Sequence, residues 1–213
     1  MGKLDFIYNR KSIRKFKDDK LPKEDIIEMI RAATYAPSPK NQQNWHFAIV
    51  EDKYKIMEMA KVVEDGHRDI ANMFKCQKEK VNYMKFMKYY TLFKNAPVVV
   101  VVYGKEYDMI EYKILKENGA SEEVLNEILS PRSDVQSIGA AVENFLLAAT
   151  AMGYGTCYMT GPTHSKKKLE DTIGFSKEGY DLMAMIALGV PEGDIHPQPP
   201  RKPIEEVITF LND

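Results

Sequence analysis

A cluster of basic and hydroxyl side chains near the N-terminus, in the stretch NRKSIRKF, is the first group of residues that could do chemistry. If this stretch is extended, Arg10, Ser12 and Arg14 point in one direction, whereas Lys11 and Ile13 point in the other. Two guanidinium groups and a hydroxyl can together bind a phosphate or a polarised carbonyl system through charge-assisted hydrogen bonds. A solvated basic surface has the same spacing, and the spacing alone favours that interpretation.

The loop APSPKNQQNW, residues 36–45, sets four amide side chains directly before the only tryptophan. Such a density of hydrogen-bonding groups indicates either a loop that faces a ligand or a tight helix-to-strand connection that uses Pro, Ser and Asn for turn geometry alone. A polar turn, MTGP, follows an expected strand at residues 159–162, and Arg201 lies in a proline-rich tail. Groups of this kind bind ligands more naturally than they catalyse, so if the protein is an enzyme, a cofactor would supply the difficult chemistry.

Several common catalytic sites are excluded because their motifs are missing from the sequence. The stretch GYGTC lacks the third glycine of a dinucleotide-binding fingerprint, and its glycines precede an expected strand where the fingerprint would follow one. The histidines and cysteines show no metal-ligand spacing, and no motif of a serine hydrolase, a zinc protease or a P-loop occurs. We therefore predict neither a Rossmann nicotinamide site nor a metal site.

The composition is that of an ordinary globular protein, with 44% hydrophobic and 29% charged residues among 213. The formal net charge of −1 gives no broad attraction to nucleic acid or to a membrane surface, so a small-molecule ligand is favoured. The N-terminus lacks a signal-peptide core, and the longest apolar run, APVVVVVY, is too short to span a bilayer. We expect a single domain over residues 1–213, located in the cytoplasm, with both cysteines reduced.

Helices and strands must position these groups, and the hydrophobic pattern predicts most of them. Helices are expected over residues 4–8, 22–36, 135–152 and 164–172, over SEEVLNEIL at 121–129, and through much of 52–95. Strands are expected over HFAIV, PVVVVVY, YGTCYM and DLMAMIAL, and the unbroken β-branched run predicts a strand buried on both faces. The polar segment 105–132 fits a lid or a partner-contacting arm.

Four stretches, in this order, resemble the FMN-dependent nitroreductase family. NRKSIRKF is similar to the family's N-terminal Arg-Arg/x-Ser-x-Arg motif, and APSPKNQQNW to its Pro-Ser-x-x-Asn-x-Gln-Pro-Trp loop. ENFLLAATAMGYGTCYMTGP is similar to its central helix, strand and flavin-edge turn, and PPRKPIEEV to its C-terminal arginine segment. The resemblance leaves mainly residues 64–95 and 105–132 unmatched. It implies an α+β fold with α/β/α layers, in which helices flank a central, mostly antiparallel sheet, and an intertwined homodimer.

The resemblance also implies where FMN would bind. Arg10, Lys11 and Ser12, together with Arg201 from the tail, would hold the phosphate and the ribityl chain. Arg14 would face the pyrimidine end of the flavin, where a cation stabilises the negative charge of the reduced ring.

Two further groups of site residues follow from the same resemblance. From the neighbouring subunit, the flavin would be reached by Pro37, Ser38, Pro39 and Asn41. The turn whose backbone N–H groups approach flavin N5 and O4 would comprise Tyr158, Met159, Thr160 and Gly161. Ser137 would place a polar side chain near the ring, and no side chain is assigned as a catalytic acid or base.

This sequence departs from the family pattern in the loop before the tryptophan. Asn44 stands where the family usually has proline, and Pro39 stands where serine or glycine is common. These changes would rearrange the hydrogen bonds of the loop. At the N5 turn, the Thr160 hydroxyl could bias the flavin toward one-electron chemistry.

The function implied is that of an FMN oxidoreductase working by ping-pong exchange, in a homodimer with its flavin sites at the subunit interface. NADH or NADPH would deliver hydride and leave, and an electron-poor acceptor such as a nitroaromatic compound, a quinone or free flavin would then take its place. Two alternatives stay open: a flavin enzyme of the same fold for reductive dehalogenation, enone reduction or flavin breakdown, and a noncatalytic FMN-binding sensor.

Overall fold

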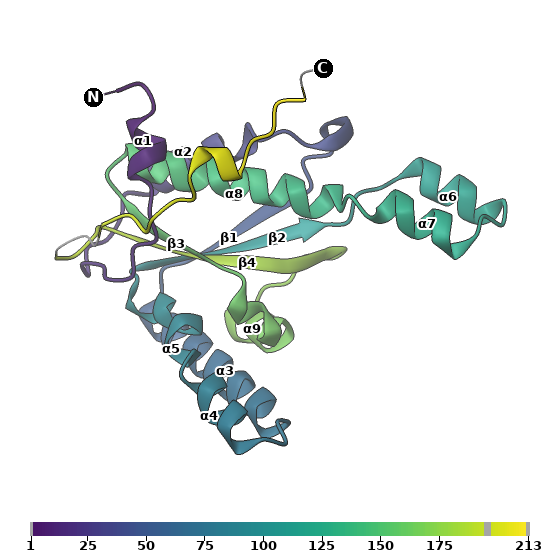
Figure 1. Cartoon of the computed structure of the whole chain (residues 1–213). Coiled ribbons are helices and arrows are strands. Elements are labelled where there is room, and N and C mark those ends of the chain that lie inside the picture. Colours follow the sequence, from purple (N-terminus) through teal and green to yellow (C-terminus); the bar gives the residue numbers. More distant parts are fainter. Residues whose placement is uncertain (1, 194–196, 212–213) are drawn as a thin grey trace.

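The computed structural model describes residues 2–193 and 197–211, and its centre is one four-stranded antiparallel sheet. The strands are β1 (Trp45–Val50), β2 (Val98–Lys105), β3 (Gly155–Met159) and β4 (Tyr180–Gly189), in the spatial order β1-β2-β4-β3. Figure 1 shows helices on both faces of this sheet. The architecture is therefore the α+β fold with α/β/α layers that the resemblance implied.

The helices fall into three groups by position. Helices α2 (Lys23–Thr34) and α8 (Ser133–Ala151) cover one face of the sheet, α1 (Asp5–Asn9) contacts α8, and α9 (Lys166–Ile173) lies on the other face. A second group follows β1 and comprises α3 (Lys53–Asn72), which packs on the same face as α9, and α4 (Gln77–Met84) and α5 (Met87–Tyr90). A third group, α6 (Ile110–Glu117) and α7 (Glu122–Leu129), projects from the body after β2 (Figure 1). Short 3₁₀ turns occupy residues 39–41, 92–95, 161–165 and 204–206.

Strand β2 is buried on both faces, as its β-branched run predicts. Val99 and Val101 belong to the core on the side of α3 and α9, whereas Val98, Val100 and Val102 belong to the core on the side of α2 and α8. This alternation follows from the two-residue period of a strand. Because apolar side chains cover both faces of the sheet, its two layers of helices are held in place.

The helix boundaries have local causes in the sequence. Asp52 caps α3, because its Oδ1 accepts hydrogen bonds from the backbone N–H of Tyr54 at 2.8 Å and of Lys55 at 3.1 Å. Helix α2 begins at Lys23, so Pro22 precedes the helix and does not form its first residue. Helix α8 ends two residues before Gly153, whose positive φ of 85° suits a glycine. None of the described helices combines the length and the apolar character needed to cross a membrane.

Tyr103 gives the fold a predicted dependence on alkaline pH. Burial raises the pKa of Tyr103 from 10.0 to about 12, and its phenol O–H donates to the Phe175 carbonyl at 3.2 Å. The unfolded chain loses this proton first, so the stabilisation is complete below about pH 10 and is lost as the pH rises toward 12.

The variant Tyr103→Phe is therefore expected to lose about 1 kcal/mol of unfolding free energy at pH 7, the size of one hydrogen bond. Between pH 10 and 12, its free energy of unfolding should fall by about 2 kcal/mol less than that of the wild type. Urea denaturation at a series of pH values measures both quantities. If the free energies of unfolding of the two proteins change with pH in parallel, the pKa of Tyr103 is not raised by folding.

Candidate functional site

The N-terminal segment 10–17 lies along one end of the sheet and is attached to two strands. Ser12 forms a parallel bridge with Thr156 at the start of β3, and Phe16 forms an antiparallel bridge with Pro191 just beyond β4. The backbone of this segment is therefore extended where the sequence predicted. Gly155 allows this attachment, because a Cβ there would lie only 2.8 Å from the Ile13 side chain.

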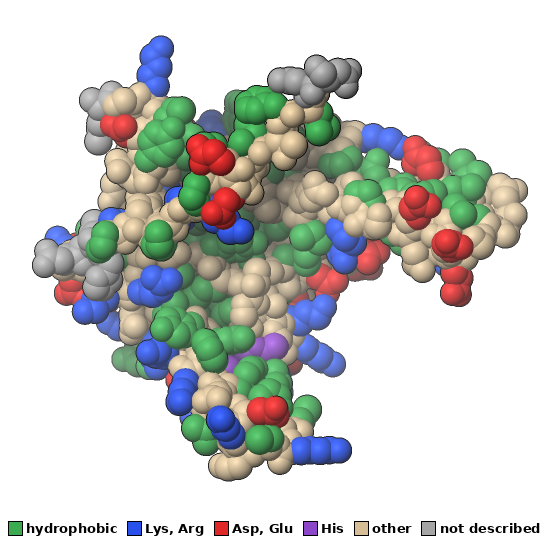
Figure 2. Space-filling model, in the orientation of Figure 1, with side chains coloured by type: hydrophobic (Ala, Val, Ile, Leu, Met, Phe, Trp, Pro, Cys, Tyr) green, Lys and Arg blue, Asp and Glu red, His purple; other side chains and the backbone are tan. Residues whose placement is uncertain are grey.

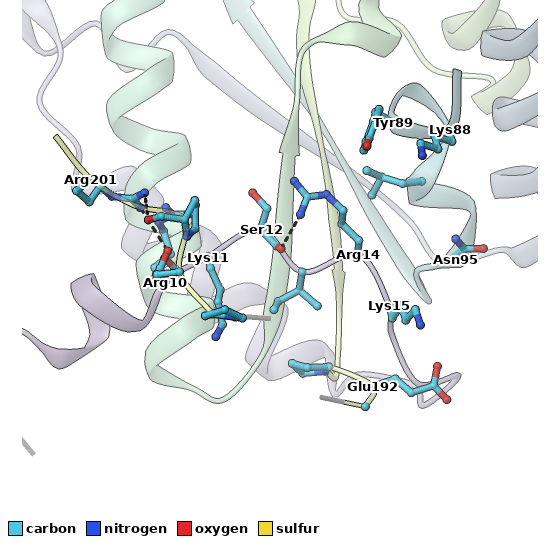
Figure 3. A pocket seen from close by; sticks show the side chains of 17 residues that line it. Arg10, Lys11, Ser12, Arg14, Lys15, Lys88, Tyr89, Asn95, Glu192 and Arg201 are labelled. Atoms are coloured by element: carbon cyan, nitrogen blue, oxygen red, sulfur yellow. Dashed lines mark hydrogen bonds between the residues drawn. The ribbon is translucent and has the colours of Figure 1, made fainter. Parts of the chain in front are cut away.

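A cavity of about 770 Å³ opens between this segment, the C-terminal tail and helix α5 (Figure 3). Its lining includes all six residues from Arg10 to Lys15, and also Lys88, Tyr89, Leu92, Asn95, Pro191, Glu192, Gly193, Pro197, Gln198, Pro199 and Arg201. Arginine and lysine side chains thus come from the first segment, from α5 and from the tail, whereas Glu192 is the one carboxylate among these lining residues. In a chain of net charge −1, such a lining favours an anionic ligand.

The two ends of the chain meet at Arg10 and Arg201. Gln198 donates from Nε2 to the backbone oxygens of Tyr8 at 2.8 Å and of Arg10 at 2.5 Å, and Arg201 Nη2 donates to Gln198 Oε1 at 3.3 Å. Figure 3 shows Arg10 and Arg201 together at one end of the cavity. Gln198 therefore connects the tail to the N-terminal segment and brings two guanidinium groups to the same place.

Arg10 already has an acidic partner. Its Nε lies 3.3 Å from Glu143 Oε1 on α8, and the Glu143 side chain is half exposed. A ligand phosphate would compete with this carboxylate for the guanidinium group.

Arg14 lies in the middle of the cavity beside Ser12 (Figure 3), and its Nη1 donates to the Ser12 carbonyl at 3.4 Å. Cys157 lies beneath them on β3, where burial raises the pKa of its thiol, although the Arg14 charge and a hydrogen bond with Ser12 act in the opposite direction. The thiol therefore stays neutral near pH 7 and leaves the positive charge of Arg14 available to a ligand.

Tyr90 of α5 and His164 of the following 3₁₀ turn contact the turn after β3 and fix its backbone. A Cβ on Gly161 would lie 2.7 Å from the Tyr90 ring, so only glycine fits here. His164 Nδ1 lies 2.6 Å from the Gly161 carbonyl oxygen, and its Nε2 lies 3.3 Å from that of Val63 on α3. Thr160 is exposed, and among the described residues its hydroxyl has no hydrogen-bond partner. The turn is thus fixed on one side and presents Thr160 on the other.

The amide-rich loop lies at the opposite end of the sheet from the cavity. Trp45, which follows this loop, pairs with Gly104 near the end of β2, whereas the cavity borders Asn95, just before β2. The eight residues of β2 span about 24 Å. Pro37, Ser38, Pro39 and Asn41 are therefore not brought to the Arg10 cavity of their own chain.

Contacts within the loop explain many of its polar side chains. Ser38 Oγ accepts from the backbone N–H of Gln43 at 3.0 Å, and Gln42 exchanges two hydrogen bonds with the Asp108 backbone, at 3.0 and 3.1 Å. Lys40 Nζ lies 3.1 Å from Glu111 Oε1, a hydrogen bond that raises the pKa of Lys40. The loop is thus attached to the base of the projecting α6–α7 segment.

Asn44 stands where the resemblance predicts a proline, and its buried side chain connects the loop to two other segments. Its Nδ2 donates to the backbone oxygens of Lys105 at 2.7 Å and of Asp134 at 3.3 Å. This amide joins the loop to the end of β2 and to the start of α8. The side-chain oxygen of Asn44 is buried without a partner among the described residues.

The loop stores backbone strain, which a substitution can test. Lys40, Asn41 and Gln43 have positive φ angles of 49°, 53° and 46°, a conformation that disfavours most side chains. Gln43 is exposed and has no side-chain hydrogen bond among the described residues. We expect Gln43→Gly to raise the free energy of unfolding by up to about 1 kcal/mol, because relief of strain exceeds the entropic cost of glycine. Chemical denaturation measures this change, and a destabilised variant would contradict it.

The remaining predicted residues lie on α8 and β3. The Ser137 hydroxyl is buried and donates to the Ser133 carbonyl at 2.8 Å within its own helix. Tyr158 is 42% exposed, and Met159 is buried against the core. Ser137 and these two β3 residues are absent from the lining of the Arg10 cavity, so their predicted contacts with a flavin stay predictions.

Some residues that line the cavity were not predicted from the sequence. Lys88, Tyr89 and Asn95 come from the poorly patterned region after α3, and Gln198 lies in the proline-rich tail. No spacing in those stretches indicates a shared site. The hydrophobic pattern gives α5 no distinct apolar face, and none of its residues is buried.

Comparisons with known proteins agree on one family. The model of the nitroreductase family matches residues 7–190. A BluB-like flavoprotein from Clostridium difficile 630 is 37% identical, with a TM-score of 0.92 over 100% of both chains. Iodotyrosine deiodinase solved with FMN and 3-iodo-L-tyrosine is 26% identical, with a TM-score of 0.70 over 98% of both chains. A protein of Archaeoglobus fulgidus with a provisional NADH dehydrogenase/NAD(P)H nitroreductase name is 26% identical over 90% of this chain and 86% of its own length.

Proposed function

The chain belongs to the nitroreductase family of flavin oxidoreductases, and from this premise we propose that it binds FMN, takes hydride from NADH or NADPH and reduces an electron-poor acceptor. The observation that carries the proposal is the convergence of Arg10, Lys11, Ser12, Arg14 and Arg201 on one cavity. An FMN phosphate carries most of two negative charges at neutral pH, and this lining is rich in charged donors. Bound FMN would supply the capacity to accept and release a hydride.

Each group of residues has its own task in this proposal. Arg10 and Arg201 bind the phosphate, and Arg14 stabilises negative charge at the pyrimidine end. The turn at Thr160 lies about 17 Å along β3 from Gly155, a span that an extended FMN molecule can cover. His164 and Tyr90 hold the backbone of that turn in position.

The site is completed by a second copy of the chain. An FMN molecule is shorter than the separation between the Arg10 cavity and the loop at the far end of β2, so one chain cannot bring both to one flavin. We assign the contacts of Pro37, Ser38, Pro39 and Asn41 to the flavin of the partner subunit. The protein is then a homodimer with two equivalent sites at its interface, and residues 1–213 act as one FMN-binding unit. The cytoplasmic location stays a prediction, which cell fractionation checks.

The visible spectrum of the purified protein tests the proposal. FMN-loaded protein should be yellow, should bleach when NADH or NADPH is added without oxygen, and should regain its colour when a nitroaromatic compound or a quinone follows. Steady-state kinetics should then give parallel double-reciprocal lines, as ping-pong exchange requires. Protein that neither contains nor takes up FMN would overturn the proposal, and flavin that no nicotinamide reduces would indicate the noncatalytic sensor.

Reductive dehalogenation is a second candidate, favoured by the free Thr160 hydroxyl. This hydroxyl sits on the turn assigned to flavin N5 and has no partner among the described residues. One of the solved relatives was crystallised with 3-iodo-L-tyrosine. If this candidate is right, the reduced protein releases iodide from 3-iodo-L-tyrosine, and Thr160→Ala loses that activity more than it loses nitroreductase activity. Iodide release that is equal in both proteins, or absent, would eliminate this role of Thr160.

A further inference from the structure

A basic arm, residues 75–90, projects from the body of the molecule beside the cavity. It carries α4 and α5, and Figure 2 shows blue side chains on it. Its sequence contains a single carboxylate, Glu79, and five lysines: Lys75, Lys78, Lys80, Lys85 and Lys88. Among residues 2–193 and 197–211, no carboxylate lies within ion-pair distance of these lysines, and two of them donate only to asparagine side chains. The arm therefore carries positive charge that the described carboxylates leave unneutralised.

Two half-exposed aromatic rings lie beside the lysines of this arm that are nearest the cavity. Phe86 and Tyr89 are 54% and 48% exposed, and their ring centroids are 6.3 Å apart. Lys88 Nζ lies 5.1 Å from the centre of the Tyr89 ring. Lys85 precedes Tyr89 by four residues in helical backbone, so both side chains share a face. Exposed rings next to cations suit a ligand that combines a stacking base with a phosphate.

The basic arm is fixed to the body through His67 on α3, whose side chain is fully buried. The Tyr83 ring stacks on His67 with centroids 4.0 Å apart, and the Tyr90 ring lies 4.7 Å from it. His67 Nε2 donates to the Tyr83 carbonyl at 3.0 Å, because a carbonyl oxygen can only accept. The exposed rings of the arm are thus held in place before any ligand binds, which lowers the entropic cost of binding.

The arm begins where a hydride donor would react under the proposed function. A Cβ on Gly161 would lie 2.7 Å from the Tyr90 ring, so Tyr90 contacts the turn assigned to flavin N5. The preceding residue, Tyr89, lines the cavity together with Lys88. Figure 3 shows these two residues at the opposite end of the cavity from Arg10. A nicotinamide placed at N5 would therefore have the basic arm beside it and the FMN phosphate at the far end.

The charge of this region discriminates between the two nicotinamide donors. NADH and NADPH share the diphosphate, and NADPH adds a 2′-phosphate on its adenosine. Many dinucleotide sites that take NADH place a carboxylate on the ribose 2′-hydroxyl, whereas cations accommodate the 2′-phosphate. Residues 80–95 contain four lysines and no carboxylate. In the described part of the chain, only Lys94 of these four lies within ion-pair distance of a carboxylate, Glu64 Oε1 at 3.2 Å. This composition favours the phosphorylated donor.

We propose that the protein selects NADPH, whose adenine stacks on Phe86 and Tyr89 and whose 2′-phosphate is held by Lys85 and Lys88. This inference rests on the proposed function, and it deepens that proposal by naming the donor. The hydride passes to bound FMN as already proposed, and NADPH becomes NADP⁺. The basic arm therefore decides which donor binds and leaves the reaction itself unchanged.

Adenosine 2′,5′-bisphosphate and 5′-AMP test the subsite at equilibrium, because they differ only in the 2′-phosphate and exchange no electrons with flavin. Both are titrated into FMN-loaded protein by isothermal calorimetry, so that FMN already occupies the Arg10 end of the cavity. The bisphosphate should bind roughly tenfold more tightly than 5′-AMP, as expected for a phosphate held by two partly solvated cations. This preference should shrink in 1 M salt, where the Debye length is about 3 Å. Equal affinities at low salt would overturn the subsite.

Removal of two lysine charges should abolish the preference. In Lys85→Gln/Lys88→Gln, the affinities for the bisphosphate and for 5′-AMP should become equal. Anaerobic stopped-flow reduction makes the same comparison with the donors themselves. The wild type should show an apparent dissociation constant for NADPH roughly tenfold below that for NADH, and the double variant should lose this difference. Contacts with the diphosphate cancel in the ratio, because both donors contain it.

Replacement of Tyr89 should give a different pattern. Tyr89→Ala removes a stacking surface for the adenine, which both donors share. The apparent dissociation constants of NADPH and NADH should therefore rise together by roughly tenfold, while their ratio stays as in the wild type. Tyr89→Phe keeps the ring and should bind both donors as the wild type does. If Tyr89→Phe loses as much affinity as Tyr89→Ala, stacking is not the role of this residue.

The matched control is Lys20→Gln/Lys23→Gln, which removes the same charge at exposed positions outside the arm and outside the cavity lining. It should keep the full preference for NADPH. A preference that this control also loses, or that Lys85→Gln/Lys88→Gln retains, would show that the arm does not hold the 2′-phosphate. Flavin that NADH and NADPH reduce with equal affinity would overturn this inference alone, whereas flavin that neither donor reduces would also overturn the proposed function.

Discussion

Replacing Arg10 with alanine is expected to weaken FMN binding by about 1.5–3 kcal/mol, or roughly 10- to 150-fold in the dissociation constant. Under the proposed assignment, the variant loses a charged hydrogen-bond donor to the phosphate, and it also leaves the Glu143 carboxylate without the cation that pairs with it. Titration of the apoprotein with FMN, followed by the quenching of flavin fluorescence, measures the change.

Glu143→Gln is the matched control, and its expected effect has the opposite sign. This variant frees Arg10 from its acidic partner, so FMN should bind about two- to fivefold more tightly, a small effect because the pair is partly solvated. Tighter binding by Glu143→Gln together with weaker binding by Arg10→Ala would locate the phosphate at this ion pair. Unchanged flavin content in Arg10→Ala would show that the phosphate binds elsewhere.

Mixed dimers should recover activity that neither parent dimer has. Under the proposed two-chain site, Ser38→Trp would obstruct the partner's site, whereas Arg10→Ala/Arg201→Ala would remove two phosphate ligands from its own site. Each homodimer then has two defective sites. A mixed dimer combines an intact cavity from the Ser38→Trp chain with an intact loop from the other chain, so it should regain one competent site of two.

Differently tagged subunits allow the mixed dimer to be isolated for this test. Its activity should be about half that of wild-type dimer, measured with a nitroaromatic acceptor at an FMN concentration below the dissociation constant of the arginine variant. An inactive mixed dimer would argue that each site is built from a single chain. The Ser38→Trp homodimer should meanwhile retain its helical content, because Ser38 is only partly buried and lies outside the α-helices.

The hydrophobic patterns predicted most helices and strands because the strongest patterns are those of the buried elements, whereas the layered arrangement was implied by the family resemblance. Val98 to Val102 form an unbroken β-branched run, and they became the central strand with alternate side chains in the two cores. The apolar period over residues 135–152 likewise predicted the helix α8, which in the structure packs against α2. Burial imposes these patterns, so they can be recognised from a single amino-acid sequence.

The site was predicted less completely, for physical reasons. Arg10 to Arg14 were recognisable because the motif is contiguous and extended. Lys88 and Tyr89 reach the same cavity through tertiary packing of a segment that has no apolar face. The role of Asn44 also depends on its surroundings: an amide that joins two distant backbone oxygens leaves no local periodicity. Two of the three positive φ angles in the loop fall on Lys40 and Gln43, residue types that do not indicate this conformation.

The wide separation of Arg10 and Arg201 along the chain has a consequence for the order of folding. Gln198, which connects them, bonds to the Arg10 carbonyl across 188 positions, and a loop of that length costs entropy to close. We therefore expect the sheet to form before the tail docks on the N-terminal segment. The proposed phosphate site would then be completed late, so coenzyme loading is expected to follow the formation of the sheet.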